Sequence, residues 1–325
     1  MKLSRVVPMI LIIVMVSADC AGQDKTSGLF AAFNRHASAS QAALGASLLS
    51  SGSAAVIFFN PAGMQYLENT QASFTYLKLN PDLDQKFMTF ALSKHLGSNF
   101  SIGLGGMSHS VGGIEGYNSS AEFTQMYKVN EWLGMLALST DMIAPFGIGV
   151  NIKAASLKIA GSEGISATGF GFDYGIVYQQ SQWFLISVSA QSAFKLNENE
   201  MSLPRIRSSM EFDIPFFWEN RGGTFQLAAT TQTEYGHWTT GFLGLHSSFP
   251  IVSGIKGYLN GRTPGQLLLT NSGTLAEQEF EPPDKWGIGG GITIDIGMDV
   301  KMKMEIAYLD EKYFDQLITT IEFIY

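Results

Sequence analysis

The run QAALGASLLSSGSAAVIFFNPAGMQYL, residues 41–67, is unlike the rest of the chain, which consists largely of short strand-like segments broken by glycine. It joins a series of small residues to an apolar cluster, residues 56–59, and then to Asn60-Pro61-Ala62-Gly63. Small residues let backbones pack closely, Pro61 cannot donate a backbone hydrogen bond, and Gly63 can adopt positive φ. The residues alone therefore predict a buried turn that carries an apolar plug.

The composition favours a membrane-embedded β protein over a soluble enzyme. Of 325 residues, 46% are hydrophobic and only 15% are charged, against roughly 25% charged residues in soluble domains. Thirty-five glycines and 12% aromatic residues fit strands with aromatic belts. The net charge of −8 argues against a nucleic-acid partner, because phosphate binding needs clustered Lys and Arg.

The N-terminus has the three parts of a secretory signal: the basic residues Lys2 and Arg5, an apolar core at residues 6–16, and small residues after it. Residues 1–22 are therefore predicted to be a cleaved signal peptide. Cys20 is the only cysteine, so lipid attachment there is an alternative, although Asp19 departs from the usual small residue. No later apolar run reaches the length of about 18 residues that a transmembrane helix needs.

From residue 71 onward, short alternating segments separated by turn residues predict an all-β fold, a transmembrane antiparallel β-barrel. In residues 288–308, Ile294 and Ile306 fall on one parity, whereas Thr293 and Lys303 fall on the other. A soluble β-sandwich alternates too, but the leader and the low charge favour the barrel. The last strand would leave an apolar edge exposed unless it pairs with the first one.

The alternation predicts about 14 strands, an even number as in bacterial single-chain barrels. They are residues 71–79, 86–95, 99–110, 131–141, 146–159, 168–179, 182–194, 205–214, 223–235, 238–249, 253–260, 285–296, 299–309 and 315–325. Residues 112–130 and 215–223 are among the stretches predicted as loops.

Two blocks carry a resemblance to a known family. GASLLSSGSAAVIFFNPAGM, residues 45–64, resembles the N-terminal signature of FadL-type outer-membrane barrels, and is most similar to the PorV/PorQ branch. FGIGVNIKAASLKIAGSEGISATGFGFDYGIVYQ, residues 146–179, resembles that branch's strand, loop and Gly-Phe-Asp-Tyr-Gly pattern. The resemblance implies a bacterial outer-membrane protein of 14 strands, with residues 23–70 as an N-terminal hatch segment inside a barrel formed by residues 71–325. The implied hatch and ligand-gating residues are Phe58, Phe59, Asn60, Pro61, Ala62, Gly63 and Met64.

The resemblance to PorV/PorQ implies a component of type IX protein secretion that binds or shuttles secreted cargo. Its partners would be outer-membrane lipid and secreted cargo proteins or a translocon subunit. The alternative is a FadL-like transporter of fatty acids or other hydrophobic small molecules, whose ligand binds in an apolar pocket and is released by movement of the hatch. Phe58, Phe59 and Met64 could line such a pocket or could pack to hold the plug in place.

The sequence predicts neither an enzyme nor a cofactor or metal site. None of the five histidines begins an HExxH motif, and a Gly-x-Ser-x-Gly elbow and a phosphate-binding loop are absent. Ser108 and Ser110 flank His109 on a predicted strand, so both serines face away from the histidine. Gly103 and Gly105 are interpreted as strand glycines that ease curvature or make room for the hatch.

Overall fold

A computed structural model of the chain describes sixteen stretches of it, and the predicted signal peptide, residues 1–22, lies outside them. The described residues are 37–44, 52–67, 70–78, 84–97, 99–160, 165–181, 183–191, 195–197, 200–201, 205–218, 221–234, 238–252, 255–265, 284–297, 299–311 and 316–325. Among them no helix combines the length and the apolar character that crossing a membrane requires.

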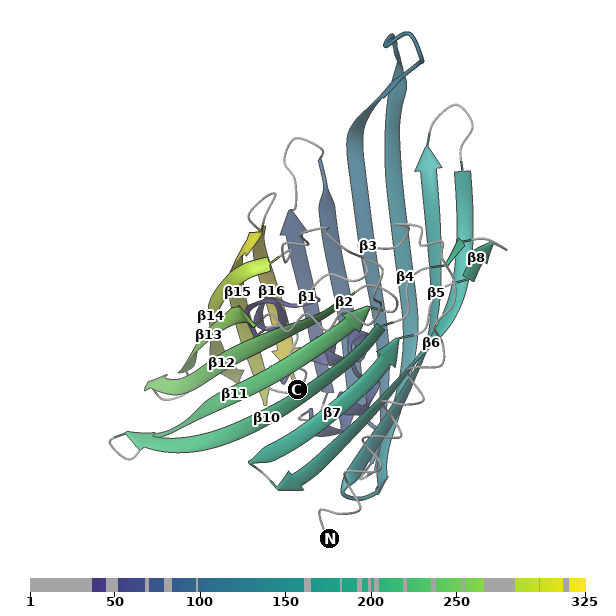
Figure 1. The fold of residues 1–325 in the computed structure, drawn as a ribbon. Helices are drawn as coiled ribbons and strands as arrows, with labels where there is room; N and C mark the ends of the chain where they lie inside the picture. The colour runs from purple at the N-terminus through teal and green to yellow at the C-terminus, as the bar shows by residue number, and fades with distance from the viewer. Residues whose placement is uncertain are drawn as a thin grey trace.

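The described residues form one antiparallel sheet of sixteen strands, fourteen of which close into a barrel (Figure 1). The fourteen are β1 (Thr70–Lys78), β2 (Lys86–His95), β3 (Phe100–Tyr117), β4 (Phe123–Ile143), β5 (Phe146–Ala160), β6 (Ile165–Ser181), β7 (Phe184–Gln191), β10 (Arg205–Trp218), β11 (Arg221–Glu234), β12 (Trp238–Val252), β13 (Ile255–Gly265), β14 (Asp284–Gly297), β15 (Val300–Glu311) and β16 (Gln316–Ile324). The other two, β8 (Lys195–Asn197) and β9 (Glu200–Met201), pair with each other, and β8 joins the end of β6. The predicted strand number and the closure of the last strand on the first are confirmed.

Side chains alternate between the two faces of the barrel wall. In β16 the residues at Gln316, Ile318, Thr320 and Glu322 are buried, and those between them are exposed. In β15 Lys303 and Glu305 are buried inside while Ile306 is half exposed on the outside. An apolar outer face around a polar interior is the arrangement of a membrane-spanning barrel, so the predicted parity is correct.

The two ends of the barrel differ in the length of their connections. Residues 144–145 and 182–183 join neighbouring strands at one end, whereas residues 79–85 and 266–283 connect strands at the other. In bacterial outer-membrane barrels the short turns face the periplasm and the longer loops face the cell exterior.

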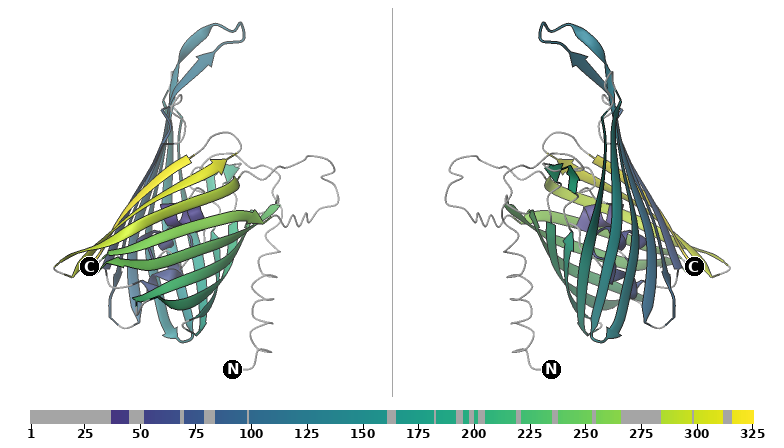
Figure 2. Two further views of the ribbon diagram at one scale, coloured as in Figure 1. Left: turned by 90° about the vertical axis from the view of Figure 1, so that its left-hand side faces the viewer. Right: turned by 90° about the vertical axis from the view of Figure 1, so that its right-hand side faces the viewer.

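The prediction of a loop at residues 112–130 is wrong. β3 and β4 continue through it and pair as far as Tyr117 and Phe123, forming the hairpin that projects furthest from the barrel in Figures 1 and 2. The period-2 hydrophobic signal disappears there because neither face of the hairpin is buried, although the backbone pairing persists. β10 and β11 likewise extend into residues 215–223.

Within the described residues, the helical elements precede the barrel strands. They are α2 (Ala39–Leu44) and two 3-10 helices, η3 (Ala54–Phe58) and η4 (Pro61–Tyr66). Figure 2 shows these segments, in purple, enclosed by the strands. The barrel proper begins with β1 at Thr70, one residue before the predicted boundary.

Candidate functional site

Residues 52–67, here called the lumenal segment, run across the interior of the barrel as two short helices with complementary caps. The Ser53 hydroxyl accepts a hydrogen bond from the Ala55 N–H (3.2 Å) and caps η3. The Asn60 Oδ1 accepts one from the Ala62 N–H (3.0 Å), and Pro61 takes the first position of η4. Ser and Asn are favoured at the N-cap of a helix, and Pro is favoured at its first position. The Asn-Pro-Ala-Gly turn therefore starts a helix, and Gly63 lies within it without needing the positive φ that the sequence allowed.

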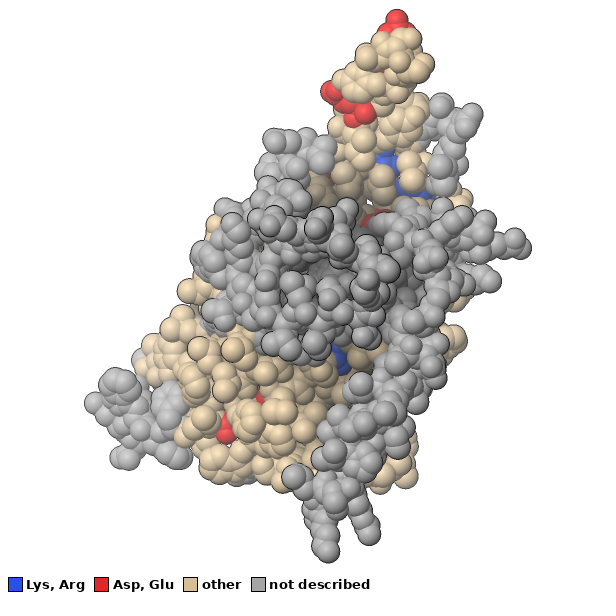
Figure 3. Space-filling model, in the orientation of Figure 1, with Lys and Arg blue, Asp and Glu red and all other residues tan. Residues whose placement is uncertain are grey.

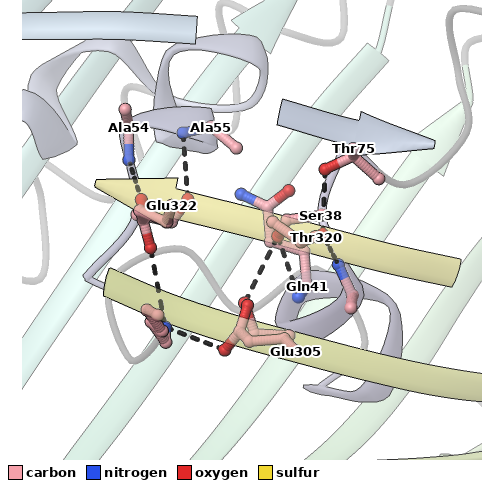
Figure 4. Close-up of polar contacts among 12 residues, drawn as sticks. Ser38, Gln41, Ala54, Ala55, Thr75, Glu305, Thr320 and Glu322 are labelled. Carbon is pink, nitrogen blue, oxygen red and sulfur yellow. Dashed lines mark hydrogen bonds and ion pairs between the residues drawn. The ribbon is translucent and has the colours of Figure 1, made fainter. Parts of the chain in front are cut away.

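One side of the lumenal segment is attached to β16. The Glu322 Oε1 accepts a hydrogen bond from the Ala54 N–H (2.9 Å), at the start of η3 (Figure 4). Lys303 on β15 forms an ion pair with Glu305 (2.8 Å) and lies 3.8 Å from Glu322. A carboxylate at a helix start satisfies backbone donors that have no partner within the helix. The wall thus holds η3 by its first turn.

The preceding helix, α2, is attached to the same part of the wall. The Ala39 N–H donates to the Thr320 hydroxyl (2.8 Å), which also contacts the Thr75 hydroxyl (2.9 Å). On β2, the Thr89 hydroxyl donates to the Ala37 carbonyl (2.8 Å). Polar residues on the inner parity of β1, β2 and β16 therefore bind main-chain groups of the N-terminal segment.

The other side of the lumenal segment is attached to β5, β6 and β7. The Asn151 Nδ2 donates to the Ile57 carbonyl (2.7 Å) and the Gln191 Nε2 donates to the Phe58 carbonyl (2.5 Å). Asn151 also contacts Asp173 (3.4 Å). Because β16 and β5–β7 lie on different parts of the barrel wall, the segment bridges the lumen.

Buried charges surround this second attachment. Lys153 on β5 forms an ion pair with Asp173 on β6 (2.5 Å), and both side chains are almost fully buried. The Arg207 guanidinium lies over the Phe59 ring, 4.5 Å from its centroid. A cation over an aromatic face is attracted by the ring quadrupole, and the attraction is stronger away from water. Phe59 is thus held from the β10 side as well.

Glycines on the inner face of the wall let the lumenal segment approach very closely. A Cβ added at Gly103 would lie 2.6 Å from the Met64 sulfur, and one at Gly105 would lie 3.0 Å from the Phe58 ring. One at Gly175 would overlap the Asn60 Oδ1. The interpretation that Gly103 and Gly105 make room for the segment agrees with these contacts.

The end of the lumenal segment is held near the short-turn end of the barrel. The Leu67 carbonyl lies 2.7 Å from the His95 Nε2, and the Gln65 side chain donates to the Ser139 hydroxyl (3.2 Å). Burial, and to a lesser extent the charge of Asp141, raises the pKa of Tyr66 to about 12. Its phenol is therefore neutral at physiological pH.

The structure brings all seven predicted hatch residues into this segment. Phe58, Phe59, Asn60, Pro61, Ala62, Gly63 and Met64 are all buried. The contacts of Phe58, Phe59 and Met64 with the wall fit the alternative in which these side chains hold the segment in place. Of the two sequence blocks that carry the family resemblance, residues 45–64 contribute Asn60 and residues 146–179 contribute Gly175, which are in contact.

The wall residues that bind the segment, chiefly Asn151, Gln191, Arg207 and Glu322, were not predicted from the sequence. Their signal was polar character on the inner parity of a strand, which Asn151 and Glu322 show in the printed sequence. The partner of each residue depends on the closed barrel and could not be read from one strand. Among the described residues, no group of three or more His, Cys, Asp and Glu side chains could hold a metal ion.

These features define a class: a membrane-spanning barrel whose lumen is occupied by its own N-terminal segment. Several solved structures are similar to the chain. The toluene transporter TbuX of Ralstonia pickettii matches with a TM-score of 0.58 and 11% identity over 88% of this chain and 97% of that one. The toluene transporter TodX of Pseudomonas putida gives 0.55 and 9%, with the same coverages. A FadL homologue of Pseudomonas aeruginosa gives 0.54 and 11%, again with the same coverages.

At these identities the likeness establishes the fold, which is that of the FadL-type outer-membrane barrels. No protein-family model and no curated protein matches the chain.

Proposed function

We propose that this chain is an outer-membrane channel that admits hydrophobic small molecules, with the lumenal segment as its gate. The observation that carries the proposal is that most of residues 52–67 are buried in the lumen, and that the segment is hydrogen-bonded to β16 on one side and to β5 and β7 on another. A solute that passes through the barrel must displace this segment or move around it. The names of the similar structures, which include toluene transporters, support a hydrophobic solute.

The chemistry of the segment fits a gate that can move. Its contacts with the β3 wall are apolar, made by Ile57, Phe58 and Met64 against glycine positions. Its polar attachments are individual hydrogen bonds from side chains such as Asn151 and Glu322 to main-chain groups. Each such hydrogen bond contributes on the order of 1 kcal/mol. An apolar ligand that replaces the apolar contacts of the segment with the wall can therefore offset the loss of a few of these hydrogen bonds.

Uptake measurements test the proposal. Cells that express the chain should take up radiolabelled toluene or a labelled long-chain fatty acid several-fold faster than cells that do not. Replacing Asn60-Pro61 with two alanines removes the η4 cap and the fixed φ, which should change the uptake rate. Heat-dependent electrophoretic migration should show that this variant still forms a folded barrel. Equal uptake of every apolar probe with and without the chain would refute the proposal.

The secretion role implied by the resemblance to PorV/PorQ stays a prediction from the sequence. Native mass spectrometry of the barrel, extracted from its own membrane in mild detergent, distinguishes the two functions. A retained apolar small molecule supports the transporter. Retained secreted proteins or a large translocon subunit would favour type IX secretion instead.

A further inference from the structure

The hairpin formed by the ends of β3 and β4, residues 112–128 and here called the arm, leaves the barrel at a β-bulge. Pairing passes from Val111–Val129 directly to Ile114–Tyr127. Gly112 and Gly113 on β3 lie opposite the single residue Lys128 on β4, and Gly113 has φ +69°. A bulge bends a strand and redirects the residues after it. Figure 2 accordingly shows the arm turning away from the line of the barrel strands.

The arm lies outside the membrane, at the end of the barrel that carries the longer connections. Trp132 is 60% exposed on the outer face of β4, as expected for an aromatic residue at the membrane interface. Phe123 lies nine residues before Trp132 in β4, which corresponds to about 30 Å at the rise of an extended strand. By the usual orientation of these barrels, the arm reaches into the cell exterior.

The tip of the arm is held in one shape by its own hydrogen bonds. The Asn118 Oδ1 accepts from the backbone N–H groups of Ser120 and Glu122 (2.9 Å each), and its Nδ2 donates to the Glu122 carboxylate (2.8 Å). The Tyr117 and Phe123 rings meet edge to face, with centroids 6.3 Å apart. A preorganised tip loses less conformational entropy when it binds a partner.

The arm combines exposed apolar side chains with negative charge. Tyr117 and Phe123 are each 57% exposed and Met126 is 54% exposed, although all three lie beyond the lipid. Glu115, which accepts a hydrogen bond from the Tyr117 hydroxyl, and Glu122 supply two carboxylates, and the one basic residue of the arm is Lys128 at its base, beside the bulge. Figure 3 shows the acidic atoms gathered on the projecting hairpin.

We propose that the arm is a docking element for another protein at the cell surface, one that presents an apolar surface flanked by Lys or Arg. Aromatic and Met side chains are enriched at the centres of protein interfaces, and the two carboxylates favour a basic rim. Lipopolysaccharide is anionic and is repelled by the same carboxylates. A second copy of the chain is disfavoured too, because its net charge is −8 and its arm is equally acidic.

Site-specific photo-crosslinking in the native cells tests the docking. A photoreactive phenylalanine analogue replaces Ser119 at the exposed tip, and in a parallel strain replaces Leu104, which is 52% exposed on the lipid face of β3. We expect a discrete protein adduct from position 119 and none from position 104. Mass spectrometry should place the crosslink beside Lys or Arg residues of the partner.

Charge reversal on the arm decides whether that adduct is specific. Glu115→Lys with Glu122→Lys should lower its yield about tenfold, because charges at an interface rim control association. Asp295→Lys, at the short-turn end of the barrel, should leave the yield unchanged. Phe123→Ser should reduce it as well. An adduct with lipid or lipopolysaccharide, an adduct insensitive to both arm changes, or no discrete adduct would overturn the proposal.

Folding and transport are measured on the same variants. The arm lies outside the closed barrel, so every variant should show normal heat-dependent migration and normal uptake of apolar probes. If the double reversal fails to assemble, Glu115→Gln with Glu122→Gln and a high-salt wash test the same attraction, since salt screens exposed charges. A yield unchanged by both would likewise overturn the proposal.

Discussion

The closest contacts of the lumenal segment are at single glycines of the wall. At Gly149 on β5, an added Cβ would overlap the Ala62 nitrogen and the Pro61 carbonyl carbon, and would lie 2.8 Å from the Ala62 Cα. These are backbone atoms, which cannot swing aside as the end of a flexible side chain can. The position therefore accepts only glycine while the lumenal segment stays where it is.

Gly149→Ala should destabilise the barrel by about 1–3 kcal/mol, the usual cost of overpacking, and should loosen the lumenal segment. Gly134→Ala is the matched control, because a Cβ there meets nothing within 4 Å. Thermal unfolding in detergent measures the stability of each variant, and limited proteolysis measures access to residues 52–67. Identical behaviour of the two variants would contradict the close approach.

Glu322 provides a second test at the residue scale, because its carboxylate accepts the Ala54 N–H. Glu322→Leu leaves that buried donor without its acceptor, which should cost about 1–3 kcal/mol. Glu322→Gln keeps an acceptor oxygen of the same reach, so its loss of stability should be smaller. The midpoints of thermal unfolding of the two variants measure this difference. A Gln variant as unstable as the Leu variant would count against a stabilising hydrogen bond from the Ala54 N–H.

At the scale of one element, β15 shows how alternation creates two environments. Ile306 is 50% exposed on the outside of the barrel and Ala307 is buried inside. Both Ile306 and Val300 have the outer parity, but Val300 begins the strand at the short turn. The same face of one strand therefore samples two depths in the membrane.

Ile306→Arg should cost roughly 2–4 kcal/mol, and Val300→Arg roughly 0–1 kcal/mol, because a charge facing lipid is most costly near the bilayer midplane. The amount of folded barrel in the membrane, read from heat-dependent migration, measures both effects. Equal losses at the two depths would mean that this face does not contact lipid.

At the scale of the whole molecule, closure of the barrel fixes the position of the lumenal segment. β16 pairs with β1, so that Glu322 and Asn151 hold the same segment from different parts of the wall. Covalent attachment of the segment to the wall should therefore stop passage without changing the barrel.

Met64→Cys with Gly103→Cys places two thiols at a contact where a Cβ on residue 103 would lie 2.6 Å from the Met64 sulfur. Oxidation, or a short thiol crosslinker, should lower uptake of apolar probes to background, and a reductant should restore uptake after oxidation. Each single variant serves as control, since the chain has one natural cysteine, Cys20, in the predicted signal peptide. Undiminished uptake by the crosslinked protein would show that passage does not require movement of the segment at this contact.

Much of the fold was predictable because a barrel wall has a local signal. Alternating side chains in residues 288–308 and 316–325 identify lipid-facing and inner parities one strand at a time. That signal fails in the arm, where neither face is buried, so the sequence predicts a loop at residues 112–130. Hydrogen bonding between β3 and β4 continues there because pairing needs only a neighbouring strand.

The sequence by itself determined that the chain is an antiparallel β-barrel and which faces of its strands point inward and outward. These depend on composition and on neighbours within one element. Only the tertiary structure decided that Asn60 meets Gly175 and that Glu322 caps η3. Such partners are far apart in the chain and come together only when fourteen strands close around the segment. Strand alternation predicts whether a side chain points into or out of the barrel, but it contains no information about which distant residue that side chain contacts.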